Sequence, residues 1–230
     1  MTLSEDFLTK GIVKIAVENP TALNLLKNAI FSPIVPIMTL NEYRLMQIKE
    51  LNSIDGIKQL YFSLAKNALH EIVGNELVMQ RNINLSIQIP NDDSSLLPVH
   101  CDTWSGDSPY EVVLWVPFVD CSGTKSMFFC DKEMSEKTNI RQYKNSAELY
   151  KAVEPNCTFM DCKYGEALIF TQNIMHGNVV NTTDETRWSL NCRFKGLFSP
   201  YADKKLGEFF EPIEIRPATK FGLEYEYPTL

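Results

Sequence analysis

The spacing of apolar residues changes near residue 80, from a helical to a strand-like pattern. Within residues 55–74 apolar side chains recur at steps of three and four, which is typical of one amphipathic helix packed on a core; they are Ile57, Leu60, Tyr61, Leu64, Ala68, Leu69, Ile72 and Val73. Asp55 is a suitable N-cap for this helix and Gly74 a suitable C-terminal stop. We therefore expect residues 1–80 to form a helical region.

From about residue 82 the chain consists of short β-rich runs separated by polar turns. The runs cover residues 83–90, 110–120, 125–130, 166–172 and 187–198, and turn-like stretches such as "NDDSS" and "NTTDET" separate them. Several short strands of this kind predict a barrel or sandwich. The tail from Ser199 is rich in Pro, Phe and Tyr, and we expect an irregular segment that wraps the core.

Length and composition fit a single globular domain. The chain has 230 residues, of which 44% are hydrophobic and 22% charged, so it has enough apolar material for a substantial core. We expect one domain over residues 1–230, with helical support from 1–80, a β core over 82–198 and a C-terminal wrap over 199–230.

Charge and apolar run length argue against two classes of partner. The net charge of -7 has the wrong sign for attraction to phosphate backbones, so nucleic acid is not expected as a main partner. The first twenty residues lack the basic and apolar segments of a signal peptide, and the longest apolar runs are of strand length. We expect a cytoplasmic protein without a membrane partner, whose six cysteines are reduced thiols.

Two of the three histidines stand beside residues that could share a metal ion with them. His100 and Asp102 are two positions apart, and in a strand that spacing places both side chains on one face. A histidine–carboxylate hydrogen bond explains this pair equally well. His70 falls in the predicted helix, where a structural or surface role is expected.

The third histidine completes a recognised ligand set. In "YGEALIFTQNIMHG" a turn at Gly165 precedes a strand that ends at Phe170, and His176 follows six residues later. Two histidines and one carboxylate form the facial triad that leaves open coordination positions on non-haem Fe(II).

The last predicted strand carries polar side chains on one face. Arg187, Ser189, Asn191 and Arg193 alternate with apolar residues, so they would point together into the barrel. A buried guanidinium requires an anionic partner. A dicarboxylate co-substrate supplies one, because Arg187 could form a bidentate pair with its distal carboxylate while Ser189 adds a hydrogen bond.

This combination resembles the Fe(II)/2-oxoglutarate-dependent oxygenases. The motif "GEALIF…HG" with an arginine eleven residues after the distal histidine is similar to the phytanoyl-CoA hydroxylase-like branch, which includes ectoine hydroxylase and small oxygenases encoded among surface-carbohydrate biosynthesis genes. The resemblance covers about residues 82–198. It implies a mainly β fold with flanking helices, a double-stranded β-helix or jelly roll.

The resemblance also implies roles for individual residues. His100, Asp102 and His176 would hold Fe(II), and 2-oxoglutarate would be bound by Arg187 and Ser189, with Gln88 matching a glutamine that assists in this branch. The implied reaction consumes O₂ and 2-oxoglutarate, releases succinate and CO₂, and usually hydroxylates a C–H bond of the substrate. Desaturation, ring closure and epimerisation remain open.

The substrate is expected to be small and polar. A carbohydrate or nucleotide-linked sugar is the first expectation from the resemblance, ahead of an amino acid derivative or an acyl compound. Candidate contacts are Trp104, which could stack on a sugar or simply pack, and three polar residues, Asn178, Asn191 and Arg193. For Arg193 a salt bridge with an acidic residue is the competing interpretation.

Two other classes of protein remain as alternatives. A 2-oxoglutarate-independent cupin-like metalloenzyme would account for the triad but not for Arg187 and Ser189. The other is a non-catalytic jelly-roll binding module whose histidines are relics or bind a structural ion, and the intact triad argues against it.

Overall fold

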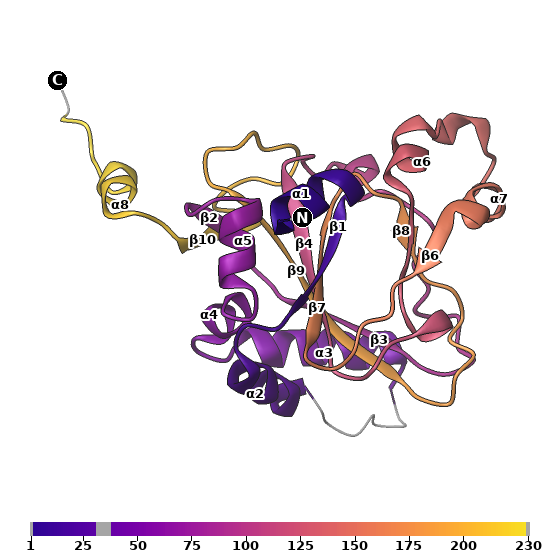
Figure 1. Ribbon diagram of the computed structural model, residues 1–230. Helices are drawn as coiled ribbons and strands as arrows, with labels where there is room; N and C mark the ends of the chain where they lie inside the picture. Colours follow the sequence, from indigo (N-terminus) through magenta and orange to yellow (C-terminus); the bar gives the residue numbers. More distant parts are fainter. Residues whose placement is uncertain (1, 31–37, 229–230) are drawn as a thin grey trace.

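Two antiparallel β-sheets face each other and form the jelly roll that the sequence predicts (Figure 1). The computed structural model describes residues 2–30 and 38–228. The larger sheet has the order β1 (Ile12–Ala16), β7 (Glu166–Thr171), β4 (Glu111–Pro117), β9 (Arg187–Gly196), β2 (Leu77–Gln80) and β10 (Phe210–Glu214), with β3 (Asn84–Gln88) also paired to β9. The smaller sheet has the order β6 (Cys157–Phe159), β5 (Phe128–Cys130) and β8 (His176–Gly177).

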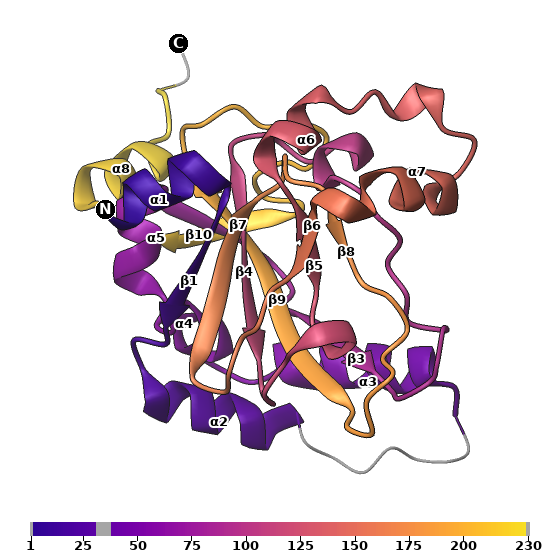
Figure 2. The ribbon, with the colours of Figure 1, turned by 45° about the vertical axis from the view of Figure 1, so that its right-hand side comes forward.

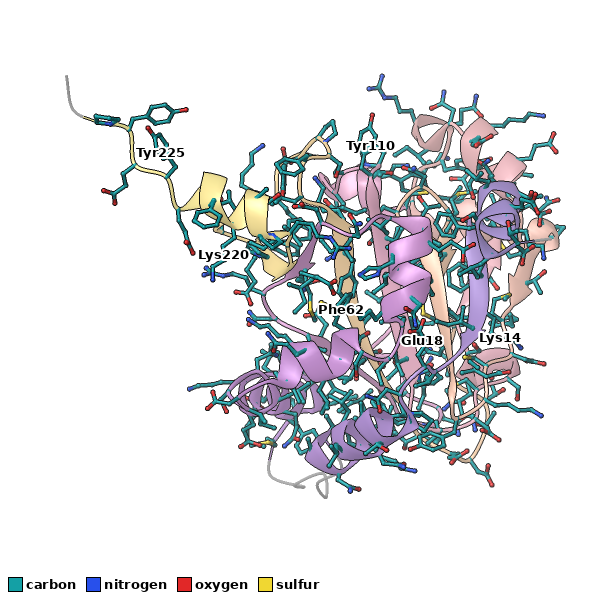
Figure 3. The ribbon with its side chains drawn as sticks, turned by 60° about the vertical axis from the view of Figure 1, so that its left-hand side comes forward. Lys14, Glu18, Phe62, Tyr110, Lys220 and Tyr225 are labelled. Atoms are coloured by element: carbon teal, nitrogen blue, oxygen red, sulfur yellow. A yellow bond between two sulfur atoms is a disulfide. The ribbon has the colours of Figure 1, made fainter. Side chains whose placement is uncertain are left out.

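Helices from the N-terminal region cover the outer face of the larger sheet (Figures 2 and 3). They are α1 (Leu3–Lys10), α2 (Pro20–Ile30), α3 (Leu40–Asn52), α4 (Ile57–Phe62) and α5 (Lys66–Ile72). Leu26, Tyr43 and Phe62 from these helices share one buried core with residues of β4 and β9. The Tyr61 hydroxyl donates to the Leu114 carbonyl at 2.7 Å and ties α4 to the sheet.

The central strands are buried on both faces, which explains their nearly continuous apolar sequence. In β4, Val112, Leu114 and Val116 face the helical core, while Val113 and Trp115 face the smaller sheet. In β9 the apolar residues from Trp188 to Phe194 also belong to the helical core. The polar residues that alternate with them therefore point between the two sheets.

Part of the predicted helical region is wrong in detail. Residues 55–74 form two short helices, α4 and α5, instead of one, and Gly56 rather than Asp55 is the N-cap of α4. Gly74 does follow the end of α5, in the left-handed region with φ 128°. The strands β1 and β2 were not predicted: β1 pairs with β7, and β2 with β9 and β10.

The C-terminal tail is more regular than predicted. It contributes β10, which extends the larger sheet by pairing with β2, and the helix α8 (Pro217–Leu223), which has no buried residue. Figure 3 shows α8 and Tyr225 standing away from the body of the molecule. Two further helices, α6 (Lys132–Lys137) and α7 (Ser146–Val153), lie in the connection between β5 and β6.

The expectation of six reduced cysteines is wrong for one pair. Cys130 on β5 and Cys157 on β6 lie directly opposite each other and are joined by a disulfide. Antiparallel partners bring their side chains close enough for this bond. The other four cysteines are free and buried. No helix in the described ranges is both long and apolar enough to cross a membrane.

Candidate metal centre and its cavity

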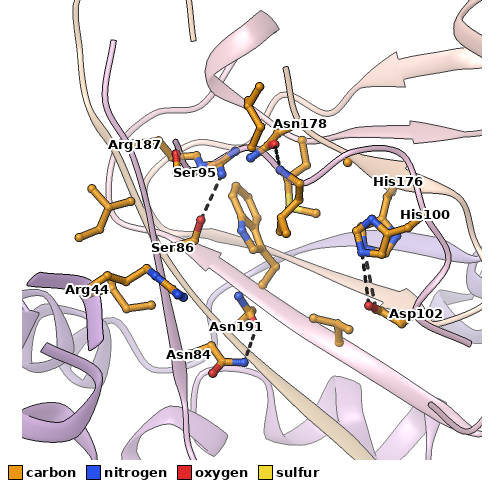
Figure 4. Close-up of a pocket in the computed structure, with 18 of the residues that line it drawn as sticks. Arg44, Asn84, Ser86, Ser95, His100, Asp102, His176, Asn178, Arg187 and Asn191 are labelled. Carbon is orange, nitrogen blue, oxygen red and sulfur yellow. Dashed lines mark hydrogen bonds and ion pairs between the residues drawn. The ribbon is translucent and has the colours of Figure 1, made fainter. Parts of the chain in front are cut away.

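A cavity of about 410 Å³ opens between the two sheets (Figure 4). Its walls come from β3, β4, β7, β8 and β9, from the first turn of α3 and from the loop over residues 94–100. Trp115, Phe170 and Met127 provide apolar surface, and several polar side chains face the same space. This volume lies within the range of about 300–1,000 Å³ that small-molecule sites occupy.

His100 and His176 are brought side by side by backbone pairing. The His100 amide donates to the His176 carbonyl at 3.0 Å, and the His176 amide donates to the His100 carbonyl at 2.9 Å. Directly opposed residues of an antiparallel bridge project to the same face. The two imidazole rings therefore lie with centroids 4.5 Å apart, at one end of the cavity.

Close packing of backbone around His176 depends on the glycine that follows it. A Cβ at Gly177 would lie 2.8 Å from both the Leu97 carbonyl oxygen and a ring carbon of Phe128. Any larger residue would push the 97–100 segment away from β8. Gly177 thus permits the bridge that places the two histidines together.

Asp102 joins the two histidines, although not through the strand that the sequence predicted. His100 forms an isolated bridge, and Asp102 is the first residue of the 3-10 helix η1 (Asp102–Ser105). The chain turns there and still directs the carboxylate inward. Its oxygens lie 3.5 Å from His100 Nε2 and 3.8 Å from His176 Nε2.

The three side chains form a group that could hold one metal ion. One ligand atom from each side chain lies within 4.8 Å of the others. Among the described residues, this is the one group of at least three histidine, cysteine or acidic side chains that could hold a metal ion in this way. His100 Nδ1 lies 2.7 Å from the Pro98 carbonyl, and His176 Nδ1 lies 2.9 Å from the Ile174 carbonyl. Each Nδ1 can donate there, which leaves each Nε2 free for a metal.

Burial and charge keep His176 and Asp102 in the protonation states that a metal requires. Burial and the neighbouring His100 lower the pKa of His176 to about 4, so its imidazole is neutral at pH 7. For Asp102 burial opposes ionisation, but the His100 hydrogen bond and the charges of His176 and Arg193 hold its pKa well below the usual range. A neutral imidazole and an ionised carboxylate are both ready to coordinate.

Arg187 lies in the cavity wall with most of its guanidinium unpaired. The side chain is 1% exposed, and its Nη2 donates to Ser86 Oγ at 3.2 Å. Among the described residues, Nε and Nη1 have no hydrogen-bond partner. Burial lowers the pKa of Arg187 to about 10, which still leaves it charged at pH 7. A buried cation with two open donors is costly unless an anion binds there.

The other two predicted co-substrate residues lie close to Arg187 but outside the cavity wall. Ser86 and Ser189 are opposite each other in the pairing of β3 with β9, as are Gln88 and Arg187. The Ser189 hydroxyl and the side-chain amide oxygen of Gln88, Oε1, are buried and unpartnered in the described part of the chain. The side-chain Nε2 of Gln88 donates to the Val179 carbonyl.

Of the predicted substrate residues, the three polar ones line the cavity and Trp104 does not. Asn178 and Asn191 line the cavity; Asn178 Oδ1 accepts from the Leu97 amide at 2.6 Å, and Asn191 Oδ1 accepts from Asn84 Nδ2 at 3.4 Å. Trp104 is 37% exposed and is not part of the described wall. Its role as a substrate contact has no geometric support.

Arg193 lines the cavity and joins a charged network behind Asp102. Its Nη2 lies 3.2 Å from Asp102 Oδ1, and its Nε lies 3.3 Å from Asp107 Oδ1. Lys204, from the loop before β10, pairs with the same Asp107 carboxylate, which is 1% exposed. The salt-bridge interpretation of Arg193 is therefore confirmed. Asp107 and Lys204 were missed because only the folded loop brings them to Arg193.

Other wall residues were also missed. Ser86 and Asn84 could have been found, since they alternate with Leu85 and Ile87 just as the polar residues of β9 alternate. Ser95, whose buried hydroxyl is unpartnered in the described ranges, also lines the cavity (Figure 4). Arg44 on α3 also reaches the cavity, and no local pattern marks it.

The fold is that of the non-haem oxygenases. ThoJ, a non-haem monooxygenase, superposes in its apo form with a TM-score of 0.67 and 14% identity, covering 94% of this chain and 84% of that one. HygX from Streptomyces hygroscopicus, solved with nickel and 2-oxoglutarate bound, gives 0.62 and 11%, covering 88% of each chain.

SnoN, a non-haem α-ketoglutarate-dependent epimerase from nogalamycin biosynthesis, gives a TM-score of 0.51 at 15% identity, covering 84% of this chain and 79% of that one. No protein-family model and no curated protein matches the sequence. The likeness to these enzymes is therefore one of fold.

Proposed function

We propose that this protein is an Fe(II)- and 2-oxoglutarate-dependent dioxygenase that oxidises a C–H bond of a small polar substrate. One observation carries the proposal: a His–Asp–His group and a fully buried, mostly unpaired arginine face the same cavity. A metal-chelating dicarboxylate is the ligand that needs both. The shared fold with HygX, which binds nickel and 2-oxoglutarate, supports the assignment.

Each residue has a defined task in this proposal. His100, Asp102 and His176 would hold the iron, with the Nδ1 contacts to backbone carbonyls fixing the orientation of both rings. When bound, iron and 2-oxoglutarate supply the oxidation of a substrate C–H bond, with O₂ consumed and succinate and CO₂ released.

The co-substrate's distal carboxylate would be held by Arg187. Its two open nitrogens offer a bidentate pair, and Ser86 holds the guanidinium in place through the third. Ser189 and Gln88 stay proposed helpers, because each has a buried polar atom that needs a partner.

The rival assignments explain less of the cavity. A cupin-like metalloenzyme without 2-oxoglutarate would leave Arg187 buried without an anion. A non-catalytic binding module would not require a His–Asp–His group beside the buried arginine. We therefore propose hydroxylation as the reaction and a sugar or nucleotide-linked sugar as the substrate, in a single cytoplasmic domain.

Succinate formation tests this proposal directly. Purified protein is incubated aerobically with Fe(II), ascorbate and 2-oxoglutarate, with and without a panel of sugars, and succinate is measured. We expect slow release without substrate and faster release with a matching one. Asp102→Ala should remove both, whereas Asp93→Ala, at an exposed loop position, should change neither. Equal release by Asp102→Ala would refute the metal assignment.

A further inference from the structure

Arg44 lines the cavity and, like Arg187, carries a positive charge without an acidic partner among the described residues. It lies in the first turns of α3, is half-buried, and points toward Ser86 and Asn191 in Figure 4. Its guanidinium Nη2 donates to Asn41 Oδ1 at 2.8 Å. Within the described ranges no carboxylate forms an ion pair with it, and the nearby Glu42 is held by Thr39 in the capping box of the helix.

The charges around the cavity do not balance without a further anion. Its described wall contains three arginines, Arg44, Arg187 and Arg193, and one acidic residue, Asp102. Arg193 is neutralised by Asp102 and Asp107, and Arg187 is assigned to 2-oxoglutarate. Arg44 is thus the arginine of this wall that has no assigned anionic partner, in a protein whose net charge is -7.

The side chains around Arg44 are those that bind hydroxyl groups. Asn41 and Asn84 offer amides, and Asn191 lies opposite Asn84 across the strands. The contact between these two asparagines is long, at 3.4 Å, so both amides have capacity for another partner. Asn41 is exposed, so this part of the wall forms the mouth of the cavity.

We propose that Arg44, with Asn41, Asn84 and Asn191, forms the subsite for an anionic group on a hydroxyl-bearing substrate. The anion is a phosphate or a carboxylate, so the substrate class is a sugar phosphate, nucleotide-linked sugar or sugar acid. This inference rests on the proposed function, because it assigns Arg187 to the co-substrate.

The volume of the cavity limits how much of the substrate it encloses. About 410 Å³ must hold both 2-oxoglutarate and the reacting part of the substrate. That space suits one sugar ring beside the iron, and any larger group would extend past Arg44 into solvent. A guanidinium at the mouth is well placed to hold an anion at that boundary.

Anion binding to variants of α3 tests the proposal. Anaerobic protein loaded with Fe(II) and 2-oxoglutarate is titrated calorimetrically with inorganic phosphate, glucose 1-phosphate, glucuronate and glucose. The variants are Arg44→Gln, Arg44→Lys and the control Lys49→Gln, which makes the same charge change at an exposed position of the same helix.

We expect an anionic sugar to bind wild-type protein at least tenfold more tightly than glucose. Because Arg44→Gln removes a charge-assisted hydrogen bond, it should lose roughly tenfold or more of that affinity. Arg44→Lys should keep part of it, and Lys49→Gln all of it. Tighter binding of glucose 1-phosphate than of glucuronate would identify phosphate as the anion, and the reverse a carboxylate.

Two results would overturn the subsite: no anion binding at millimolar concentration, or equal binding by wild type and Arg44→Gln. Failure of the proposed function is recognised separately, because loading with iron and 2-oxoglutarate is followed by its own absorption band. If loading fails, the titration is repeated on metal-free protein. An anion bound by Arg187 would then persist in Arg44→Gln, whereas one bound by Arg44 would not.

Discussion

The two ends of the cavity satisfy their charged groups in opposite ways. At the metal end the protein supplies partners for its own charges: Asp102 contacts His100, His176 and Arg193, and Asp107 holds Arg193 from behind. At the other end Arg187 is more deeply buried, and two of its nitrogens have no partner among the described residues.

This difference indicates that the charged groups at the metal end are held in fixed positions, whereas Arg187 at the other end is free to bind an anion. A charged group with protein partners on all sides is fixed in place and is ready to orient a ligand. A buried charge without partners reduces stability in the empty protein, and the loss is recovered when an anion binds. The metal end is therefore organised in advance, and the Arg187 end is completed by the co-substrate.

The largest effect is expected from removal of the carboxylate at the metal end. Asp102→Ala should weaken Fe(II) binding by more than the roughly 10–100-fold that loss of a supporting residue causes, because it deletes a ligand itself. Equilibrium dialysis with Fe(II) under anaerobic conditions measures this change. The circular dichroism spectrum should match that of wild type, and retained iron affinity would contradict the assignment.

Removal of a guanidinium at the metal end should destabilise the protein. Arg193→Met leaves Asp102 and Asp107 without their shared cation, and breaking a buried pair costs roughly 3–5 kcal/mol. We expect the lower end of that range, since Arg193 is 18% exposed and Lys204 still contacts Asp107. Urea unfolding measures it, with exposed Arg141→Met as the control.

The same substitution at the other end should have the opposite effect on stability. Arg187→Met removes a buried charge that lacks an acidic partner, so the metal-free protein should unfold at the same or higher urea concentration. The KM for 2-oxoglutarate should rise roughly 10–150-fold, from a lost contribution of about 1.5–3 kcal/mol. A large loss of stability with an unchanged KM would show that Arg187 has a structural role and does not bind 2-oxoglutarate.

A smaller effect, on the pH dependence of stability, is expected from Glu111, whose carboxyl group interacts with the charges of Asp107, Arg193 and Lys204. Burial raises the pKa of Glu111 to about 7, above its usual range, so folding favours the protonated carboxyl. The unfolded chain ionises this group at lower pH, and stability from this source declines as pH rises from about 4.5 toward 7. Each unit of pKa difference corresponds to about 1.4 kcal/mol.

Glu111→Gln should therefore flatten the fall in the free energy of unfolding between pH 5 and pH 8. Urea unfolding at both pH values measures the slope, and Glu208→Gln, at an exposed position, should keep the wild-type slope. An identical slope in Glu111→Gln would show that another group causes the pH dependence.

The sequence predicted the β core better than the elements around it. Strands buried on both faces have strong apolar runs, so β3, β4, β5, β7 and β9 were found close to their observed bounds. β1 and β10 are the edge strands of the larger sheet. The sequence placed β1 within the predicted helical region and β10 within the predicted irregular tail. Their strand conformation depends on pairing with distant partners, which local periodicity does not reveal.

The candidate site shows the same division. The side chains of His176 and Arg187 could be placed together because each lies in or beside a predicted strand. His100 was assigned to them from its spacing to Asp102 and from the family resemblance. Lys204 and Arg44 reach the site from a loop and a helix far away in sequence, and Asp107, although close to Asp102 in the chain, meets its partner Arg193 only after folding. Only the folded chain brings them there.

One titration tests the central claim that iron and 2-oxoglutarate share this cavity. Metal-free protein is titrated anaerobically with Fe(II) and then with 2-oxoglutarate, and the weak visible metal-to-ligand charge-transfer band is recorded. We expect a band in wild type, its loss in Asp102→Ala, and its appearance only at higher 2-oxoglutarate concentration in Arg187→Met. Iron binding without any band would rule out the shared site and favour a cupin-like metalloenzyme.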